Sequence, residues 1–256
     1  MKSTYGPLAG TIFQYFNNQV AFLSTPSLSN SSPPTSCCIL LGGLSDGLLP
    51  TPYTLPLQTC CHENNIAFCN PLTSSSYLGF GYNSLTSDCA ELLELISCLQ
   101  TNNEISKFYV VGHSTGCQQA VSLLQMIDSD STPNNIISGA VLQAAVSDRE
   151  GYHDLPNLPN FLETANQLVN SNKGDEFMPR NSMWSPITAN RFLSLYSKHG
   201  QDDMFSSDLT PDELSSKLSH LSRFENVAFV HSGSDEYVPS HISRPLLYSK
   251  LQAAGE

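Results

Sequence analysis

A short apolar run near the middle of the chain ends in a Gly-x-Ser-x-Gly pattern. Residues 107–111 read Lys-Phe-Tyr-Val-Val, residues 112–116 read Gly-His-Ser-Thr-Gly, and a helical pattern follows to about Ile127. A serine in this pattern, between a strand and a helix, is typical of a nucleophile elbow, a strained turn that exposes the hydroxyl. The glycines omit Cβ atoms that would collide where strand and helix meet. We therefore predict that Ser114 is a nucleophile; the alternative is a glycine-rich turn with an inert serine.

A second glycine-rich loop is predicted to complete this site. Residues 37–41 form an apolar run that predicts a buried strand, and Gly-Gly-Leu-Ser-Asp-Gly follows at 42–47. Where a nucleophile elbow is present, the loop after this strand donates a backbone N–H to the oxyanion of the tetrahedral intermediate. We predict that the N–H groups of Leu44 and Thr115 form this oxyanion hole. Considered without the elbow, the loop is only a tight turn.

The other apolar segments alternate between strand and helix patterns. Apolar residues at helical spacing predict a helix over 84–99, with Ser84 or Thr86 as its N-cap. Alternating strands and helices at this spacing indicate an α/β fold, with a mostly parallel central sheet and helices on both faces. Further strands are predicted at 11–16, 19–23, 66–69, 136–142 and 226–231.

The periodic pattern breaks between residue 151 and about residue 222. This polar segment contains several prolines and helical patches at 161–169 and 211–221. Long insertions in a compact domain are usually functional, so we expect a single domain, 1–256, with a helical cap insertion at about 151–222. Its large apolar residues could line a ligand pocket or pack the cap's own core. They are Met178, Met183, Trp184 and Phe192.

Charge and composition exclude several classes of partner. The chain has 23 acidic and 11 basic residues and a net charge of −12. Since no basic cluster could pair with phosphates, we predict neither a nucleic-acid nor a membrane partner. No apolar segment has the length of a signal peptide or a membrane span, so we expect a cytoplasmic protein. The eight cysteines form no C-x-x-C pair, and we expect buried free thiols and neither a metal nor a cofactor.

Six stretches of the chain resemble one family of α/β-hydrolases. They are Gly-Gly-Leu-Ser-Asp-Gly (42–47), Ser-Ser-Ser-Tyr-Leu-Gly-Phe-Gly (74–81), Gly-His-Ser-Thr-Gly-Cys-Gln (112–118), Leu-Gln-Ala-Ala-Val-Ser-Asp-Arg-Glu (142–150), Asp-Asp-Met-Phe-Ser-Ser-Asp-Leu (202–209) and Ser-Gly-Ser-Asp-Glu-Tyr-Val-Pro (232–239). This family, long filed as of unknown function, includes the fungal fusarinine C esterases, which cleave ester bonds of an iron-carrying siderophore. The resemblance extends from about Gly10 to Pro239. It implies an α/β-hydrolase fold, Ser114 as the nucleophile and Asp235 as the triad acid, with Asp148 as the alternative acid.

The histidine of the triad has no evident counterpart. In α/β-hydrolases the order along the chain is serine, acid, histidine, with the histidine on a loop after one more strand. The residues after Asp235 predict a helix at 242–254 and no further strand, so we expect the C-terminus to be truncated relative to the family. His241 is the remaining candidate base. His113 is expected to pack within the elbow with its ring turned from the site, and His231 to be buried. Surface positions are expected for His62, His153, His199 and His220.

Two functions from different classes follow. The first is a serine esterase that acts on a small-molecule ester through an acyl-enzyme, without metal or cofactor. The second is a catalytically inactive hydrolase scaffold with a binding or regulatory role, which the missing histidine favours. The motifs that carry the family resemblance favour the first. The substrate is not fixed by any of these residues.

Overall fold

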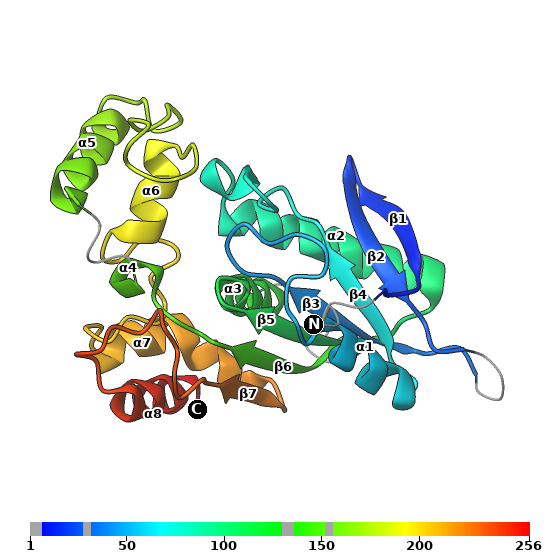
Figure 1. The fold of residues 1–256 in the computed structure, drawn as a ribbon. Coiled ribbons are helices and arrows are strands. Elements are labelled where there is room, and N and C mark those ends of the chain that lie inside the picture. The colour runs from blue at the N-terminus through cyan, green and yellow to red at the C-terminus, as the bar shows by residue number, and fades with distance from the viewer. Residues whose placement is uncertain (1–6, 28–31, 130–135, 152–155) are drawn as a thin grey trace.

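The computed structural model describes residues 7–27, 32–129, 136–151 and 156–256, which are built around a seven-stranded sheet (Figure 1). The strand order is β1-β2-β4-β3-β5-β6-β7. β2 pairs antiparallel with β1 and with β4, and the other pairs are parallel, so the predicted mostly parallel sheet is confirmed. The strands are β1 (Thr11–Phe16), β2 (Gln19–Ser24), β3 (Ser36–Leu41), β4 (Ala67–Pro71), β5 (Lys107–His113), β6 (Ile137–Gln143) and β7 (Val227–Val230).

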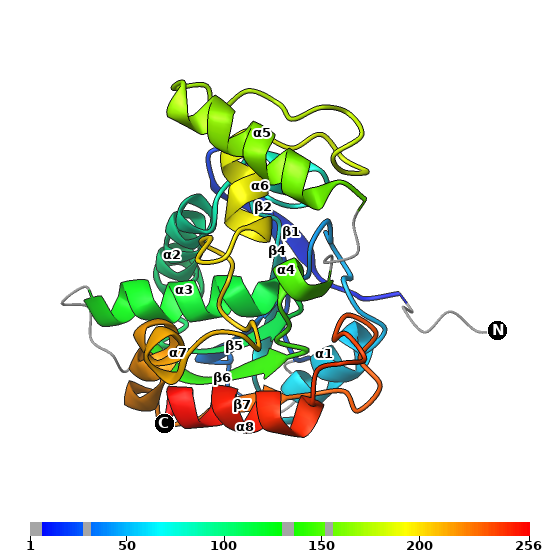
Figure 2. The ribbon, with the colours of Figure 1, turned by 90° about the vertical axis from the view of Figure 1, so that its left-hand side faces the viewer.

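Helices cover both faces of the sheet, as predicted (Figures 1 and 2). α2 and α3 pack on one face, and α1 packs on the other. Of the two predicted caps of α2, the structure selects Ser84, whose side chain accepts a hydrogen bond from the Ser87 N–H. The helices are α1 (Thr54–Glu63), α2 (Leu85–Asn103), α3 (Gly116–Ser129), α4 (Asp148–Gly151), α5 (Leu158–Asn170), α6 (Ala189–Tyr196), α7 (Pro211–Leu218) and α8 (Arg244–Gly255), with 3-10 turns η1 (Gly79–Gly81) and η3 (Ser219–Arg223).

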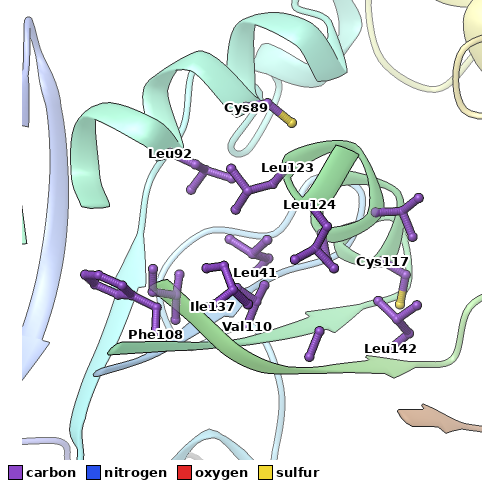
Figure 3. Close-up of a cluster of buried hydrophobic side chains, with 14 of the residues drawn as sticks. Leu41, Cys89, Leu92, Phe108, Val110, Cys117, Leu123, Leu124, Ile137 and Leu142 are labelled. Carbon is purple, nitrogen blue, oxygen red and sulfur yellow. The ribbon is translucent and has the colours of Figure 1, made fainter. Parts of the chain in front are cut away.

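The main hydrophobic core lies between the sheet and helices α2 and α3 (Figure 3). Phe108 and Val110 of β5 point into this core, whereas Tyr109 and Val111 pack on the α1 side. A strand covered on both faces needs apolar residues at every position, which explains why β5 is an unbroken apolar run. Each large side chain buried here stabilises the fold by roughly 1.5–3 kcal/mol. The core therefore fixes where β5 ends and α3 begins.

A second hydrophobic cluster forms where α5 and α6 pack against each other. Met178, Met183 and Phe192 are buried in it together with Phe80 of η1, so the cluster is shared between the segment 151–222 and the rest of the fold. Trp184 differs because 56% of its surface stays exposed. Figure 2 shows α5 and α6 on one side of α3, with α7 and α8 on the other. The description of 151–222 as a cap stays a prediction.

β5 turns into α3 through residues 112–116, and the turn leaves no room for side chains at its glycines. A Cβ at Gly112 would lie 2.5 Å from the carbonyl oxygen of Gly116. A Cβ at Gly116 would lie 2.6 Å from the carbonyl oxygen of Gly42, in the loop after β3. Real Cβ atoms do not approach backbone oxygens so closely, so both predicted glycine requirements are confirmed.

Gly116→Ala tests how far the fold depends on this contact. The added methyl group meets backbone atoms that cannot rotate away, so we expect the free energy of unfolding to fall by about 1–3 kcal/mol. Gly233→Ala is the matched control, because a Cβ there meets nothing within 4 Å. Denaturant unfolding of both variants measures the difference. Equal stability of the two variants would contradict the close approach of the elbow to the β3 loop.

Candidate active site

Ser114 occupies the strained position of the turn between β5 and α3. Its φ is 53°, in the left-handed region that side chains other than glycine rarely adopt. Its N–H donates to the carbonyl oxygen of Gln143 at 3.0 Å, and its carbonyl oxygen accepts from the Cys117 N–H at 2.8 Å. A strained residue held at both ends by hydrogen bonds is a common feature of functional sites. The predicted strand-turn-helix is present, while the chemical role of Ser114 stays a prediction.

A cavity of about 360 Å³ opens at Ser114. Its walls come from the loops that follow β3, β5, β6 and β7, together with Trp184 from the segment between α5 and α6. Ligands in open α/β sheets bind in this position, outside the carboxyl ends of the parallel strands. The cavity therefore lies where the fold and the elbow both expect a substrate.

The predicted oxyanion donors lie on two sides of this corner. Leu44 and Thr115 both line a smaller neighbouring cavity of about 40 Å³, and Leu44 also lines the cavity at Ser114. In the β3 loop the N–H of Gly43 donates a hydrogen bond to Oδ2 of Asp46 at 2.7 Å. Within the described residues neither the Leu44 N–H nor the Thr115 N–H donates a hydrogen bond. These two groups could therefore receive an oxyanion.

The two candidate acids differ in their relation to the cavity. Asp148, at the start of α4, lines it together with Ser114. Asp235 follows β7 and is buried; its Oδ1 accepts from the Tyr237 N–H at 3.0 Å, and Arg244 donates to its carbonyl oxygen at 2.8 Å. Tyr237 lines the cavity, but Asp235 is not one of the lining residues. Asp148 therefore lies at the cavity. Asp235 does not line it, but Tyr237, two residues later in the sequence, does.

Asp148 has an unusual electrostatic environment. Burial raises the pKa of its carboxyl to about 8, and the nearby negative charge of Asp202 acts in the same direction, while Arg191 opposes both. Gln118 donates to its Oδ2 at 3.0 Å. A carboxyl group with this pKa is largely protonated at neutral pH.

Two of the stretches that carry the family resemblance bind each other. The residues after β6 are clamped by side chains of 203–208, and this clamp holds the loop that carries Asp148. Its pairs are Ser147 with Ser206 at 2.5 Å, Arg149 with Asp208 at 3.3 Å, and Glu150 with Ser207 at 2.6 Å. The distinctive motifs at 142–150 and 202–209 therefore have a structural role beside the cavity.

The histidines are not all where the sequence predicted them. His113 packs as expected, with its ring hydrogen-bonded to Gln143 of β6 and edge to face with Tyr53, and the residue also borders the cavity at Ser114. His220, expected at the surface, is buried and bonded to the Val121 carbonyl oxygen at 3.0 Å, because η3 packs against α3. His231 is partly buried and stacks on Tyr248 at a ring separation of 3.5 Å.

His241, the candidate base, is exposed before α8 and does not line the cavity. His62 lies on α1, bonded to Ser24 at 3.2 Å, and His199 is largely exposed. His153 lies outside the described residues. In the part of the chain that the structure describes, the hydroxyl of Ser114 makes no hydrogen bond to any imidazole.

Three residues near Ser114 escaped the sequence prediction. Gln143 ends the strand next to the elbow, and its place at the carboxyl edge of a predicted parallel sheet was a usable signal. Asp46 lies in the Gly-Gly-Leu-Ser-Asp-Gly motif, but nothing in the sequence indicates that its carboxylate accepts a hydrogen bond from the Gly43 N–H. Tyr53 precedes α1, and no sequence pattern predicts that its hydroxyl donates a hydrogen bond to Gln143.

The eight cysteines are all free, and six of them are buried, as predicted. The described residues contain no group of three or more His, Cys, Asp or Glu placed to hold a metal ion. None of the described helices is both long and apolar enough to cross a membrane.

The model of the family described as "Protein of unknown function (DUF1749)" matches residues 1–255. The chain belongs to the DUF1749 family. A UPF0613 protein of Schizosaccharomyces pombe is 28% identical over 269 residues, covering 95% of this chain and 83% of the relative. The fusarinine C esterase sidJ of Aspergillus fumigatus is 26% identical over 299 residues, covering 97% of this chain and 84% of the relative.

Solved structures identify the fold of this DUF1749 protein. The siderophore hydrolase EstB from Aspergillus fumigatus superposes with a TM-score of 0.78 at 23% identity, over 98% of this chain and 85% of that one. A second structure, titled as an α/β hydrolase fold protein of unknown function, has a TM-score of 0.65 at 17% identity, over 98% and 84% of the two chains. The predicted α/β-hydrolase fold is confirmed.

The raised pKa of Asp148 predicts how stability depends on pH. Its folded-state pKa of about 8 lies above its ordinary value of 3.8, so proton binding stabilises the fold fully below about pH 4, and this contribution is lost as pH rises through about 8. Asp148→Asn has no titrating group and keeps an oxygen for Gln118. We therefore expect wild type to lose stability relative to this variant between about pH 5 and about pH 8.

Thermal melts of both proteins across this range measure the effect. Asp175→Asn, at an exposed carboxylate, is the control and should follow wild type. If the melting temperatures of wild type and Asp148→Asn changed by the same amount across this pH range, burial would not disfavour the ionised form of the Asp148 carboxyl.

Proposed function

We propose that this DUF1749 protein hydrolyses carboxylic esters through an acyl-enzyme on Ser114. The observation that carries the proposal is the strained elbow, which presents Ser114 to a cavity of about 360 Å³ beside two backbone N–H groups that lack partners among the described residues. Relatives named as esterases or siderophore hydrolases support the class of reaction. The fold alone would not, because it hosts many unrelated functions.

In the proposed reaction the Ser114 oxygen attacks the ester carbonyl carbon. The N–H groups of Leu44 and Thr115 stabilise the oxyanion that forms, and one donor of this kind is worth about 10²–10³ in kcat. The alcohol then leaves, and water hydrolyses the acyl-enzyme. Asp235 is the proposed acid that orients a histidine base, with Asp148 as the alternative because it lines the cavity.

The proposed substrate is a small ester of the siderophore type. One relative is named a fusarinine C esterase. Because this chain belongs to the DUF1749 family, we propose the same class of substrate, a siderophore ester, for it. Trp184 and Tyr237 offer exposed aromatic surface at the cavity. Such side chains suit the apolar part of an acyl or alcohol group.

One observation favours a second function, an inactive scaffold with a binding or regulatory role. The Ser114 hydroxyl has no imidazole within hydrogen-bond distance among the described residues. A serine hydroxyl without a base is a poor nucleophile at neutral pH. The scaffold would keep the cavity and its aromatic rim for binding.

Labelling with a fluorophosphonate decides between these functions. We expect wild type to be labelled and to hydrolyse p-nitrophenyl esters, and Ser114→Ala to lose both activities because the attacking oxygen is gone. Ser216→Ala, on the exposed surface of α7, is the control and should match wild type. Undiminished turnover by Ser114→Ala would refute the nucleophile, and an unlabelled, folded wild type would support the scaffold.

Trp184→Ala tests whether the aromatic rim contacts substrate. Loss of this apolar surface should raise KM for a p-nitrophenyl octanoate about tenfold, or ~1.4 kcal/mol, and change KM for the acetate much less. Phe177→Ala is a matched control, because Phe177 is 58% exposed but does not line the cavity. If Trp184→Ala changed KM equally for both esters, the acyl group would not reach the indole.

A further inference from the structure

The carboxylate of Asp46 lies close to Ser114, in the loop after β3. A Cβ added at Gly43 would lie 3.3 Å from Oδ2 of Asp46 and 3.0 Å from Cβ of Ser114, so the carboxylate and the serine flank the same point. The Gly43 N–H donates to Oδ2, and this bond holds the side chain of Asp46 within the loop. Asp46 also lines the cavity at Ser114. An ester bound at Ser114 would therefore react next to a carboxylate.

This carboxylate has no cationic partner in the part of the chain that the structure describes. The one hydrogen bond that it accepts there comes from the neutral Gly43 N–H. No lysine or arginine is among the described residues that line the cavity at Ser114. Arg191, which lines the smaller neighbouring cavity together with Asp46, is already paired with Asp202 at 2.9 Å. The negative charge of Asp46 is therefore not compensated by these residues.

An uncompensated carboxylate in this position affects the proposed reaction. The carbonyl oxygen of the ester gains negative charge as Ser114 attacks, and the charge of Asp46 opposes this change. A positive charge on the substrate would offset the repulsion, because oppositely charged groups attract more strongly in a cavity than in water. A negative charge on the substrate would add to the repulsion. The charge of an ester therefore decides how well it suits this cavity.

The other walls of the cavity also suit a cation. Trp184 and Tyr237 line it, and 56% and 50% of their surfaces are exposed. The faces of aromatic rings attract ammonium groups, and tryptophan does so most strongly. Asp148 is the second carboxyl of the cavity; burial raises its pKa to about 8, and a bound cation would favour its ionised form. A cationic ligand is therefore favoured on several sides.

We propose that the substrate is an ester with an ammonium group near the scissile carbonyl, and that Asp46 determines this specificity by pairing with the ammonium; this rests on the proposed function. Asp46 and Ser114 flank the same point at Gly43, so only a few bonds separate the ammonium from the carbonyl carbon. An α-amino acyl ester carries this charge on its acyl side, and the ester of an amino alcohol carries it on its alcohol side. Both present the same group to Asp46.

Matched pairs of substrates test the role of the charge. Alanine ethyl ester and ethyl 2-methylpropanoate differ by an ammonium in place of a methyl group on the acyl side. Choline propanoate and 3,3-dimethylbutyl propanoate differ by the charge alone on the alcohol side. The readout is the ratio of kcat/KM within each pair, compared between proteins, because an ammonium group also changes the intrinsic reactivity of its ester.

Asp46→Asn is the decisive variant. Its amide oxygen can still accept the Gly43 N–H, but the charge is gone, so we expect the ratio of cationic to neutral ester to fall about tenfold or more. The pair that responds shows which side of the ester carries the ammonium. Asp175→Asn removes the same charge from an exposed position and is the control, with ratios expected to equal those of wild type.

Protection of wild type against fluorophosphonate labelling provides a second readout that needs no variant. We expect tetramethylammonium to slow labelling at a concentration about tenfold below that of tert-butanol, its neutral counterpart. Should Asp46→Asn fail to fold, this comparison decides whether the cavity prefers a cation.

Three results would overturn the inference and leave Ser114 as the nucleophile. They are unchanged ratios in Asp46→Asn for both pairs, equal protection by the two probes, and a fall in Asp175→Asn as large as in Asp46→Asn. The last result would assign the preference to the overall charge of the protein. An unlabelled wild type would refute the proposed function and this specificity with it.

Discussion

The contact between the β5–α3 turn and the loop after β3 is the constraint on which the rest of the site depends. The missing side chain of Gly116 lets the turn approach Leu41 and Gly42, and that of Gly112 lets the end of β5 approach the start of α3. The same approach brings Gly43 against Ser114, since a Cβ at Gly43 would lie 3.0 Å from the serine Cβ. One backbone contact therefore positions the hydroxyl and the neighbouring amides at once. Catalysis by preorganised amides requires such rigidity, because the donors must be in place before charge develops.

Most of the fold could be predicted because local patterns and global structure agree. The apolar run of β5 needs only burial on both faces, and the glycines on either side of Ser114 admit few alternatives. The paired motifs that follow β6 and precede α7 were visible as unusual stretches, but their binding to each other was not. Pairing between distant segments depends on tertiary packing, which no local pattern records.

His220 illustrates the same limit more sharply. It was predicted at the surface because it lies in a polar segment, whereas η3 packs against α3 and buries the histidine beside the Val121 carbonyl oxygen. The prediction for His113 concerned the end of a regular strand, and its ring packs against Gln143 of the neighbouring strand and against Tyr53. The error therefore arose where the segment is irregular and its packing partner is distant in the sequence.

The arrangement around Ser114 also bears on which acid could serve a histidine base. Asp148 lines the cavity, and burial raises the pKa of its carboxyl to about 8, so the group is largely protonated at neutral pH. An acid that orients the base and stabilises the imidazolium must be ionised. Asp148 therefore fits that role less well than its place at the cavity alone suggests.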